Sequence, residues 1–186
     1  LPSPFPWLES LAWNSEGDRL AYCAIFDAYP AKIVVNEREA NVWQHFMVKP
    51  PEGVHVKGYS SPLVWLDDRA IGYLGEARGF VDVYSHGAGS RATAGMQRPG
   101  VVVHNFAVTP TGGAVTYEAT SEQFPELVLR GQTPTTLTQL NPQTKEWALP
   151  TVRHISWKSS DGKRVGGILE LPPNVEKGKK LPLVVA

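Results

Sequence analysis

Residues 13–22, with the sequence WNSEGDRLAY, decide the fold, because their order of aromatic residue, tight turn and strand occurs three times. The second copy, residues 65–73, is WLDDRAIGY, and the third, residues 108–117, is VTPTGGAVTY. The copies start 52 and then 43 residues apart, a period that suits four short strands per unit, as in a propeller blade. Each blade buries its faces only against its neighbours, so a turn that recurs in every unit is expected. A β-sandwich is the alternative, since its strands also alternate with turns.

Short apolar and β-branched segments bounded by Gly, Pro, Asp, Asn or Ser indicate strands along most of the chain. No apolar stripe with helical spacing extends over 11 or more residues, and a short helical turn is an option only at residues 7–11. The pattern therefore predicts a mainly β fold. The expected strands are residues 19–26, 32–35, 70–74, 80–84, 101–108, 114–119 and 126–130.

Composition excludes several classes of protein. The 18 Lys and Arg residues balance 18 Asp and Glu residues, whereas a nucleic-acid binder would show a basic excess. With 42% hydrophobic and 19% charged residues, the chain is too apolar to be disordered. The single cysteine, Cys23, lies in an apolar run and is predicted to be a buried, inert thiol.

The sequence contains no apolar run long enough for a membrane span and no signal-peptide pattern. The lone cysteine and the lack of an Asn-x-Ser/Thr acceptor favour a cytoplasmic location, although a missing N-terminus could have carried a signal. We therefore expect a cytoplasmic protein with no nucleic-acid or membrane partner.

The pattern of apolar and polar residues changes near residue 150. In residues 154–172, HISWKSSDGKRVGGILELP, two alternating strands flank an Asp161-Gly162 turn and predict a hairpin. The apolar run 181–186, LPLVVA, predicts a strand that is buried on both faces, as in a parallel sheet. We expect a partial propeller of about three blades in residues 1–149 and the start of an α/β domain in residues 150–186. Because the chain stops inside the apolar run, we expect it to be a fragment.

Four ordered segments carry a family resemblance: residues 137–142 (LTQLNP), 155–162 (ISWKSSDG), 166–172 (GGILELP) and 181–185 (LPLVV). In this order and spacing they resemble the domain junction of the prolyl oligopeptidase family of serine peptidases, and most of all its acylaminoacyl-peptidase and dipeptidyl-peptidase branch. The resemblance implies a β-propeller followed by an α/β-hydrolase domain that cleaves short peptides through a Ser-His-Asp triad. It also implies the remaining blades and hydrolase domain as partners, with a homo-oligomer left open.

The chain ends before the motifs that carry catalysis in that family. The resemblance implies that the His-Gly-Gly turn, the Gly-x-Ser-x-Gly nucleophile elbow and the later Asp and His would follow residue 186. No catalytic, cofactor-binding or metal-binding residue is therefore assigned, and the chain alone is expected to be inactive. The alternative is a non-catalytic propeller that serves as a binding module, although such a module would not need the appended segment 155–185.

Several segments imitate catalytic motifs, and each has a simpler interpretation. Residues 58–62 (GYSSP) begin like a nucleophile elbow but have Pro in place of the final Gly. Residues 86–89 (HGAG) imitate an oxyanion turn but lead into a loop of small residues, without the Gly-Lys-Ser/Thr of a phosphate site. Asp67 and Asp68 fit a turn, as do residues 159–161.

The remaining polar candidates are histidines and loop charges. Residues 36–39 and 76–78 are expected to be solvated loop charges, with contact to a substrate terminus as the alternative. The histidines lack the spacing of metal ligands. They are His45, His55, His86, His104 and His154.

Overall fold

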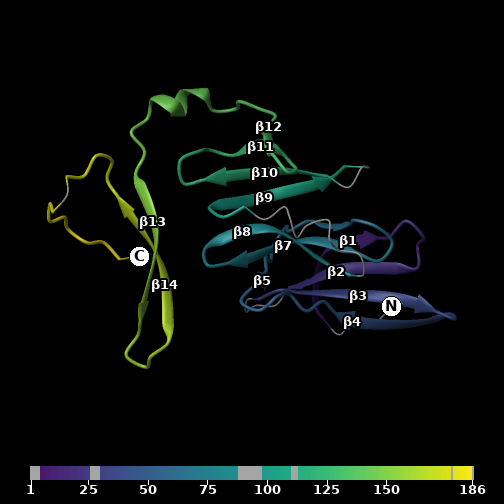
Figure 1. Ribbon diagram of the computed structural model, residues 1–186. Helices are drawn as coiled ribbons and strands as arrows, with labels where there is room; N and C mark the ends of the chain where they lie inside the picture. The colour runs from purple at the N-terminus through teal and green to yellow at the C-terminus, as the bar shows by residue number, and fades with distance from the viewer. Residues whose placement is uncertain (1–4, 26–29, 88–97, 110–112, 177, 186) are drawn as a thin grey trace. The chain divides into compact units, whose positions relative to one another are not determined.

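The computed structural model describes residues 5–25, 30–87, 98–109, 113–176 and 178–185. The chain divides into two compact units, Leu1–Leu140 and Asn141–Ala186, and nearly all the regular elements in its described part are strands (Figure 1). Within the described ranges, no helix is long and apolar enough to cross a bilayer. The elements are β1 (Trp7–Trp13), β2 (Arg19–Ile25), β3 (Lys32–Glu39), β4 (Val42–Met47), β5 (His55–Val56), β6 (Leu63–Trp65), β7 (Ile71–Ala77), β8 (Phe80–His86), β9 (Val101–Val108), β10 (Ala114–Thr120), β11 (Glu126–Arg130), β12 (Thr135–Thr136), the 3-10 helix η1 (Pro142–Glu146), β13 (Thr151–Lys158) and β14 (Arg164–Leu171).

The first unit contains three consecutive antiparallel meanders. Strands β1–β4 form one sheet in sequence order. Strands β5–β12 form a second sheet, but β8 and β9 meet in a single parallel pair, Val81 with Val102, so this sheet consists of two meanders joined at a seam. In the middle meander, β5 and β6 pair with successive parts of β7. This mainly β, propeller-like arrangement is the fold class expected from the repeat.

The repeated turn has the same hydrogen bond in all three meanders. The residue after the first strand donates its backbone N–H to a carbonyl four or five residues later: Asn14 to Arg19 at 3.0 Å, Leu66 to Ala70 at 2.8 Å, and Thr109 to Gly113 at 2.8 Å. In each turn a polar side chain also accepts a backbone N–H; these side chains belong to Asn14, Asp67 and Thr109. The sequence repeat is therefore a structural repeat.

Two apolar clusters pack the meanders against one another. One contains Ile33 of β3 together with Ile71 and Tyr73 of β7, and joins the first meander to the second. The other contains Leu74 of β7 and Val103 of β9, and joins the second meander to the third. Each fully buried aliphatic side chain of this size contributes about 1.5–3 kcal/mol. The first unit is thus held together by alternating strands that present apolar residues to both neighbours.

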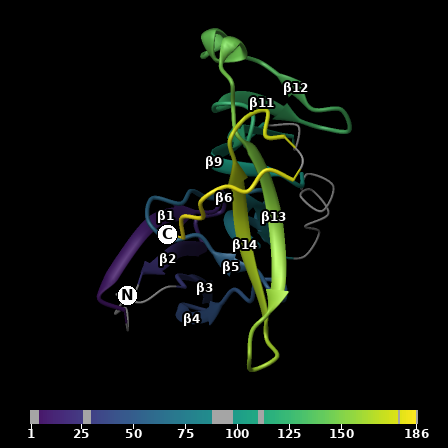
Figure 2. The same ribbon diagram turned by 90° about the vertical axis from the view of Figure 1, so that its left-hand side faces the viewer.

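The second unit contains a long hairpin of β13 and β14, which Figure 2 shows along its length. Its turn is closed by the backbone bond from Ser159 N–H to the Lys163 carbonyl at 2.9 Å, and Gly162 has a φ of 80°. The hairpin predicted around Asp161-Gly162 is therefore confirmed. The Trp157 ring lies across Gly167, where an added Cβ would be 2.9 Å from the ring.

Two elements differ from expectation. The helical turn considered at residues 7–11 is wrong, because β1 pairs with β2 and carries a bulge between Glu9 and Ala12 that obscures its strand alternation. The strand expected at residues 181–186 is also wrong for its described part. Residues 181–185 form no strand, and Val184 is 86% exposed. A strand requires a neighbour for its backbone hydrogen bonds, and none of the described strands pairs with this segment.

Candidate functional site

The segment that imitates a nucleophile elbow, residues 58–62, is a loop between β5 and β6 with no helix after it. Tyr59 and Ser60 both have positive φ, at 46° and 57°. The Ser60 N–H donates to Glu9 Oε2 at 2.8 Å, whereas Ser61 Oγ is buried without a described partner. Among the described residues no hydrogen bond joins either hydroxyl to a base, and no helix follows the turn, so this segment is not a catalytic elbow.

The segment that imitates an oxyanion turn begins at the end of β8, and its residues 88 and 89 lie outside the described residues. Gly87 has a φ of 129°, and a Cβ built there would be 2.1 Å from the Arg69 carbonyl oxygen. Only glycine can occupy such a position without moving the Arg69 backbone. Gly87 therefore serves close backbone packing.

Gly87→Ala is expected to lower the free energy of unfolding by about 2–3 kcal/mol, because both the strained φ and the clash with backbone oppose it. Urea denaturation followed by circular dichroism measures this loss. Gly100→Ala is the matched control, since Gly100 also has positive φ but nothing within 4 Å of its Cβ position. Equal losses in the two variants would contradict the packing role of Gly87.

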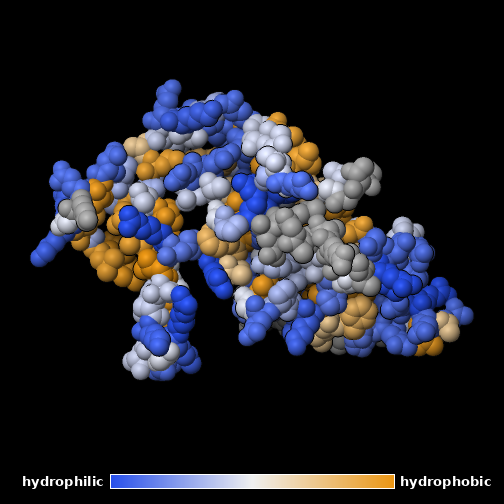
Figure 3. All heavy atoms as spheres, in the orientation of Figure 1, coloured by the Kyte–Doolittle hydropathy of each residue, from blue (hydrophilic) through white to orange (hydrophobic). Residues whose placement is uncertain are grey.

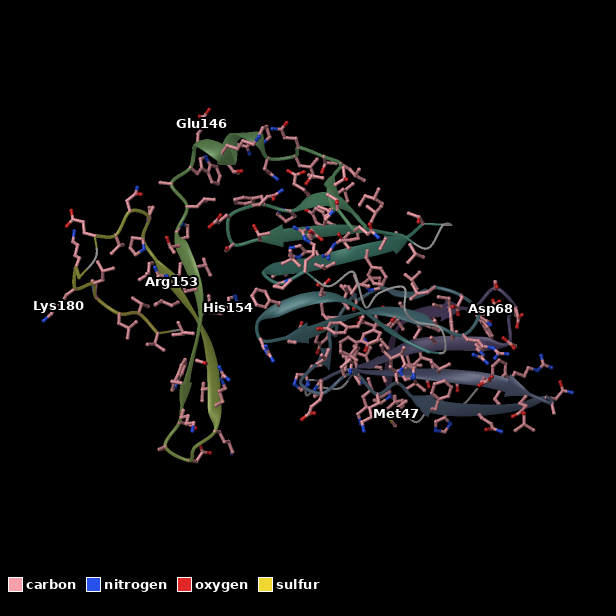
Figure 4. All side chains as sticks on the ribbon, in the orientation of Figure 1. Met47, Asp68, Glu146, Arg153, His154 and Lys180 are labelled. Carbon is pink, nitrogen blue, oxygen red and sulfur yellow. The ribbon has the colours of Figure 1, made fainter. Side chains whose placement is uncertain are left out.

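The acidic residues singled out in turns have local structural roles. Asp67 Oδ1 accepts the N–H groups of Arg69 and Ala70, both at 2.7 Å. Asp68, labelled in Figure 4, accepts from the Ser15 hydroxyl of the first repeat turn. Hydrogen bonds from Ser159 and then Lys163 lower the pKa of the Asp161 carboxyl. The turn interpretation of these residues is confirmed.

The remaining candidate residues, the charged segments and the histidines, do not gather at one site among the described residues. Residues 36–39 are not loop charges, because β3 extends through Glu39; Asn36 is buried there and Glu37 pairs with Arg19. Likewise, Glu76 and Ala77 belong to β7. The five histidines lie on five different strands, and in the described ranges no group of three His, Cys, Asp or Glu side chains could hold a metal ion. Figure 4 labels His154 on the hairpin.

Cys23 is buried in the core, as predicted. Burial, with a smaller contribution from the charge of Glu9 on the neighbouring strand, raises the pKa of its thiol to about 11. The thiolate is the nucleophilic form of cysteine, and such a pKa suppresses it at neutral pH. Cys23 therefore has no catalytic use here.

A buried group of charged residues, which we call the Arg130 cluster, joins the second and third meanders. Arg130 Nη2 lies 2.5 Å from Glu118 Oε2 and 3.4 Å from Asp82 Oδ1, and its Nε donates to Thr116 Oγ1 at 3.1 Å. Arg98 pairs with the second Glu118 oxygen and donates its backbone N–H to Asp82 Oδ2 at 2.7 Å. Two cations thus face two carboxylates.

The two positive and two negative charges of the Arg130 cluster balance, and its charged groups bond to one another. The side chains of Arg130 and Glu118 are only 2% and 3% exposed. Burial raises the pKa of the Asp82 carboxyl, while the N–H groups of Arg98 and Val83 and the charge of Arg130 oppose that rise. A site for a reacting group would need a free donor or acceptor, and here each charged group faces another member. The cluster is a structural contact between meanders.

An open arrangement lies where β1 meets the loop 58–62, and we call Trp7, Glu9, Tyr59 and Ser60 the Glu9 surface. The Trp7 and Tyr59 rings meet edge to face with centroids 5.9 Å apart, and both are about half exposed. Glu9 Oε1 accepts the Trp7 indole N–H at 3.1 Å, and its Oε2 accepts the Ser60 N–H. Ser10, at φ 54° in the β1 bulge, donates its hydroxyl to the Ser61 carbonyl at 2.5 Å. Sequence analysis did not identify this surface.

Comparison with known proteins finds similarity only at the level of the fold. No protein-family model matches the chain, and no curated protein sequence matches it. Its structure is similar to an acylaminoacyl peptidase in complex with Z-Gly-Gly-Phe-chloromethyl ketone, with a TM-score of 0.51, 13% identity, 94% of this chain covered and 45% of that one. The acylaminoacyl peptidase of Pyrococcus horikoshii gives a TM-score of 0.50, 14% identity and the same two coverages.

A third solved structure is a variant of the isopeptidase AtxE2 with astexin3-dC4 bound, at a TM-score of 0.50 and 14% identity. The match covers 97% of this chain and 28% of the isopeptidase chain. The chain therefore spans less than half of each of these structures. These three structures are all peptidases, and at 13–14% identity the likeness shows a similar fold.

Proposed function

We propose that this chain is the propeller-side and junction segment of a serine peptidase that cleaves short peptides by acyl transfer. The observation that carries the proposal is the order of its parts: three meanders closed by the same turn, followed by a separate hairpin unit. Peptidases with a similar fold over this length support it. A binding propeller alone would not need the hairpin unit.

In this proposal the catalytic groups are supplied by polypeptide outside these 186 residues. Acyl transfer by a serine needs a nucleophile, a base and an orienting acid within hydrogen-bond reach, together with donors for the oxyanion. In the described residues, neither the Ser60 nor the Ser61 hydroxyl is hydrogen-bonded to a base, and the Arg130 cluster engages Asp82 and Glu118. The meanders would act by limiting which peptides reach the site, and the hairpin by beginning the catalytic domain.

The hairpin unit also presents apolar surface: in Figure 3, apolar residues gather over the end of the hairpin away from its turn and over the segment that follows β14. Ile155 and Trp157, which the register places on one face of the hairpin, are 41% and 50% exposed. A two-stranded hairpin is at best marginally stable in water and needs a further layer on its apolar face. We propose that the remaining sheet of a hydrolase domain supplies this layer.

The purified 186-residue chain is expected to release no product from acylated or dipeptidyl p-nitroanilides, because its described residues assemble no triad. The longer product of the same reading frame, if it has a nucleophile elbow, is expected to hydrolyse one of them and to react with a fluorophosphonate probe. The two proteins are assayed side by side at equal concentration. Fluorophosphonate-sensitive turnover by the short chain would contradict the proposal, and an inert long product would favour the binding module.

A further inference from the structure

The Glu9 surface combines two exposed aromatic rings with a carboxylate that has no cationic partner among the described residues. Both oxygens of Glu9 accept a hydrogen bond, but these come from neutral groups, the Trp7 indole and the Ser60 backbone. A carboxylate has about four acceptor positions, so acceptor capacity remains after two bonds. The negative charge of Glu9 is therefore left uncompensated.

The two rings are positioned by backbone segments in an unfavourable, left-handed conformation. Tyr59 and Ser60 are successive non-glycine residues with left-handed φ, and Ser10 on the facing strand has the same conformation. Non-glycine residues adopt it only where surrounding contacts enforce it, and such positions are concentrated at binding sites. Here the bonds from Ser60 N–H to Glu9 and from the Ser10 hydroxyl to Ser61 hold the loop and so position Tyr59 beside Trp7.

We propose that the Glu9 surface binds an ammonium or guanidinium group of a peptide. Tyr and Trp faces attract organic cations through their quadrupoles, and an adjacent carboxylate adds a charge-assisted hydrogen bond. A neutral apolar ligand would leave the Glu9 charge buried and unpaired, so the pair of rings with a carboxylate selects for positive charge. The cation could be a lysine or arginine side chain, or a free N-terminus. This inference does not rest on the proposed function.

Fluorescence anisotropy with three neutral-dye-labelled peptides of one length tests the proposal on the full 186-residue chain. The first is N-acetylated with a central lysine, the second has norleucine in its place, and the third has norleucine and a free N-terminus. The lysine peptide or the free-N-terminus peptide is expected to bind at least tenfold more tightly than the acetylated norleucine peptide. Which of the two binds identifies the source of the cation.

Two variants and a matched control connect binding to the surface. Glu9→Gln keeps one acceptor but removes the charge, and Tyr59→Gly removes the ring while suiting the left-handed φ, so the fold is preserved. Each is expected to weaken cation binding at least tenfold. Glu16→Gln, in the exposed turn after β1, removes an equal charge and should change nothing. The proposal would be overturned if all three peptides bound with equal affinity. It would also be overturned if Glu9→Gln bound the cationic peptide as tightly as the unmodified chain.

Discussion

Arg130→Met is expected to lower the free energy of unfolding by about 3–5 kcal/mol, the largest loss predicted for a single substitution in this chain. The substitution keeps much of the side-chain volume but leaves Asp82 and Glu118 facing each other without the cation between them. Uncompensated charges in a buried position are far more costly than the pair they replace. Urea denaturation at one protein concentration, followed by circular dichroism, measures the loss.

Two comparisons separate the loss of charge pairing from a loss of packing. Lys163→Met removes an ion pair whose two members are 82% and 53% exposed, and should cost less than about 1 kcal/mol. Arg130→Met combined with Glu118→Gln leaves Arg98 and Asp82 in balance, and should recover part of the stability. If Arg130→Met costs no more than Lys163→Met, the Arg130 cluster does not stabilise the contact between meanders.

The 186-residue chain is expected to self-associate and to bind an apolar dye, because both outer faces of its first unit carry large exposed apolar side chains. The outer face of the first meander presents Trp13 and Met47, which are 54% and 49% exposed. The outer face of the third presents Leu127 and Leu129. Soluble monomers rarely leave contiguous patches of this kind uncovered.

Size-exclusion chromatography and dye fluorescence measure this association. Met47→Lys combined with Leu129→Lys places one charge on each face and is expected to shift the chain toward the monomer and to reduce dye binding severalfold. Glu16→Lys alters an exposed turn and is the control. A wild-type chain that elutes as a monomer, melts cooperatively and binds no dye would show that these faces need no cover.

The meanders could be predicted from sequence wherever one face of a strand is apolar and the turn between strands is marked. In β2 both requirements are met: Cys23 faces the cluster shared with the second meander, and Tyr22 faces a smaller cluster with Ala24 and Val34 on the opposite side of the sheet. In β11 the apolar pattern is misleading, since Glu126, Val128 and Arg130 are buried while the two leucines between them are half exposed. Arg130 is stabilised there by Glu118 on β10, and Glu126 by the backbone N–H of Leu140 beyond β12, contacts that local patterning does not reveal.

The Glu9 surface could not be predicted for a similar reason. It joins residues 51 positions apart, Glu9 with Ser60, and depends on left-handed backbone at residues that are not glycine. Neither property has a signal in local sequence.

The seam between β8 and β9 has a consequence for the order of folding. Within each meander, strands bond to strands one or two elements away in sequence, so forming a meander closes only short loops and is entropically inexpensive. Contacts between meanders span much longer separations, such as the 48 positions from Asp82 to Arg130. Contacts over long separations slow folding. We therefore expect the meanders to form as early local units, and their docking, which removes water from Arg130, to limit the rate.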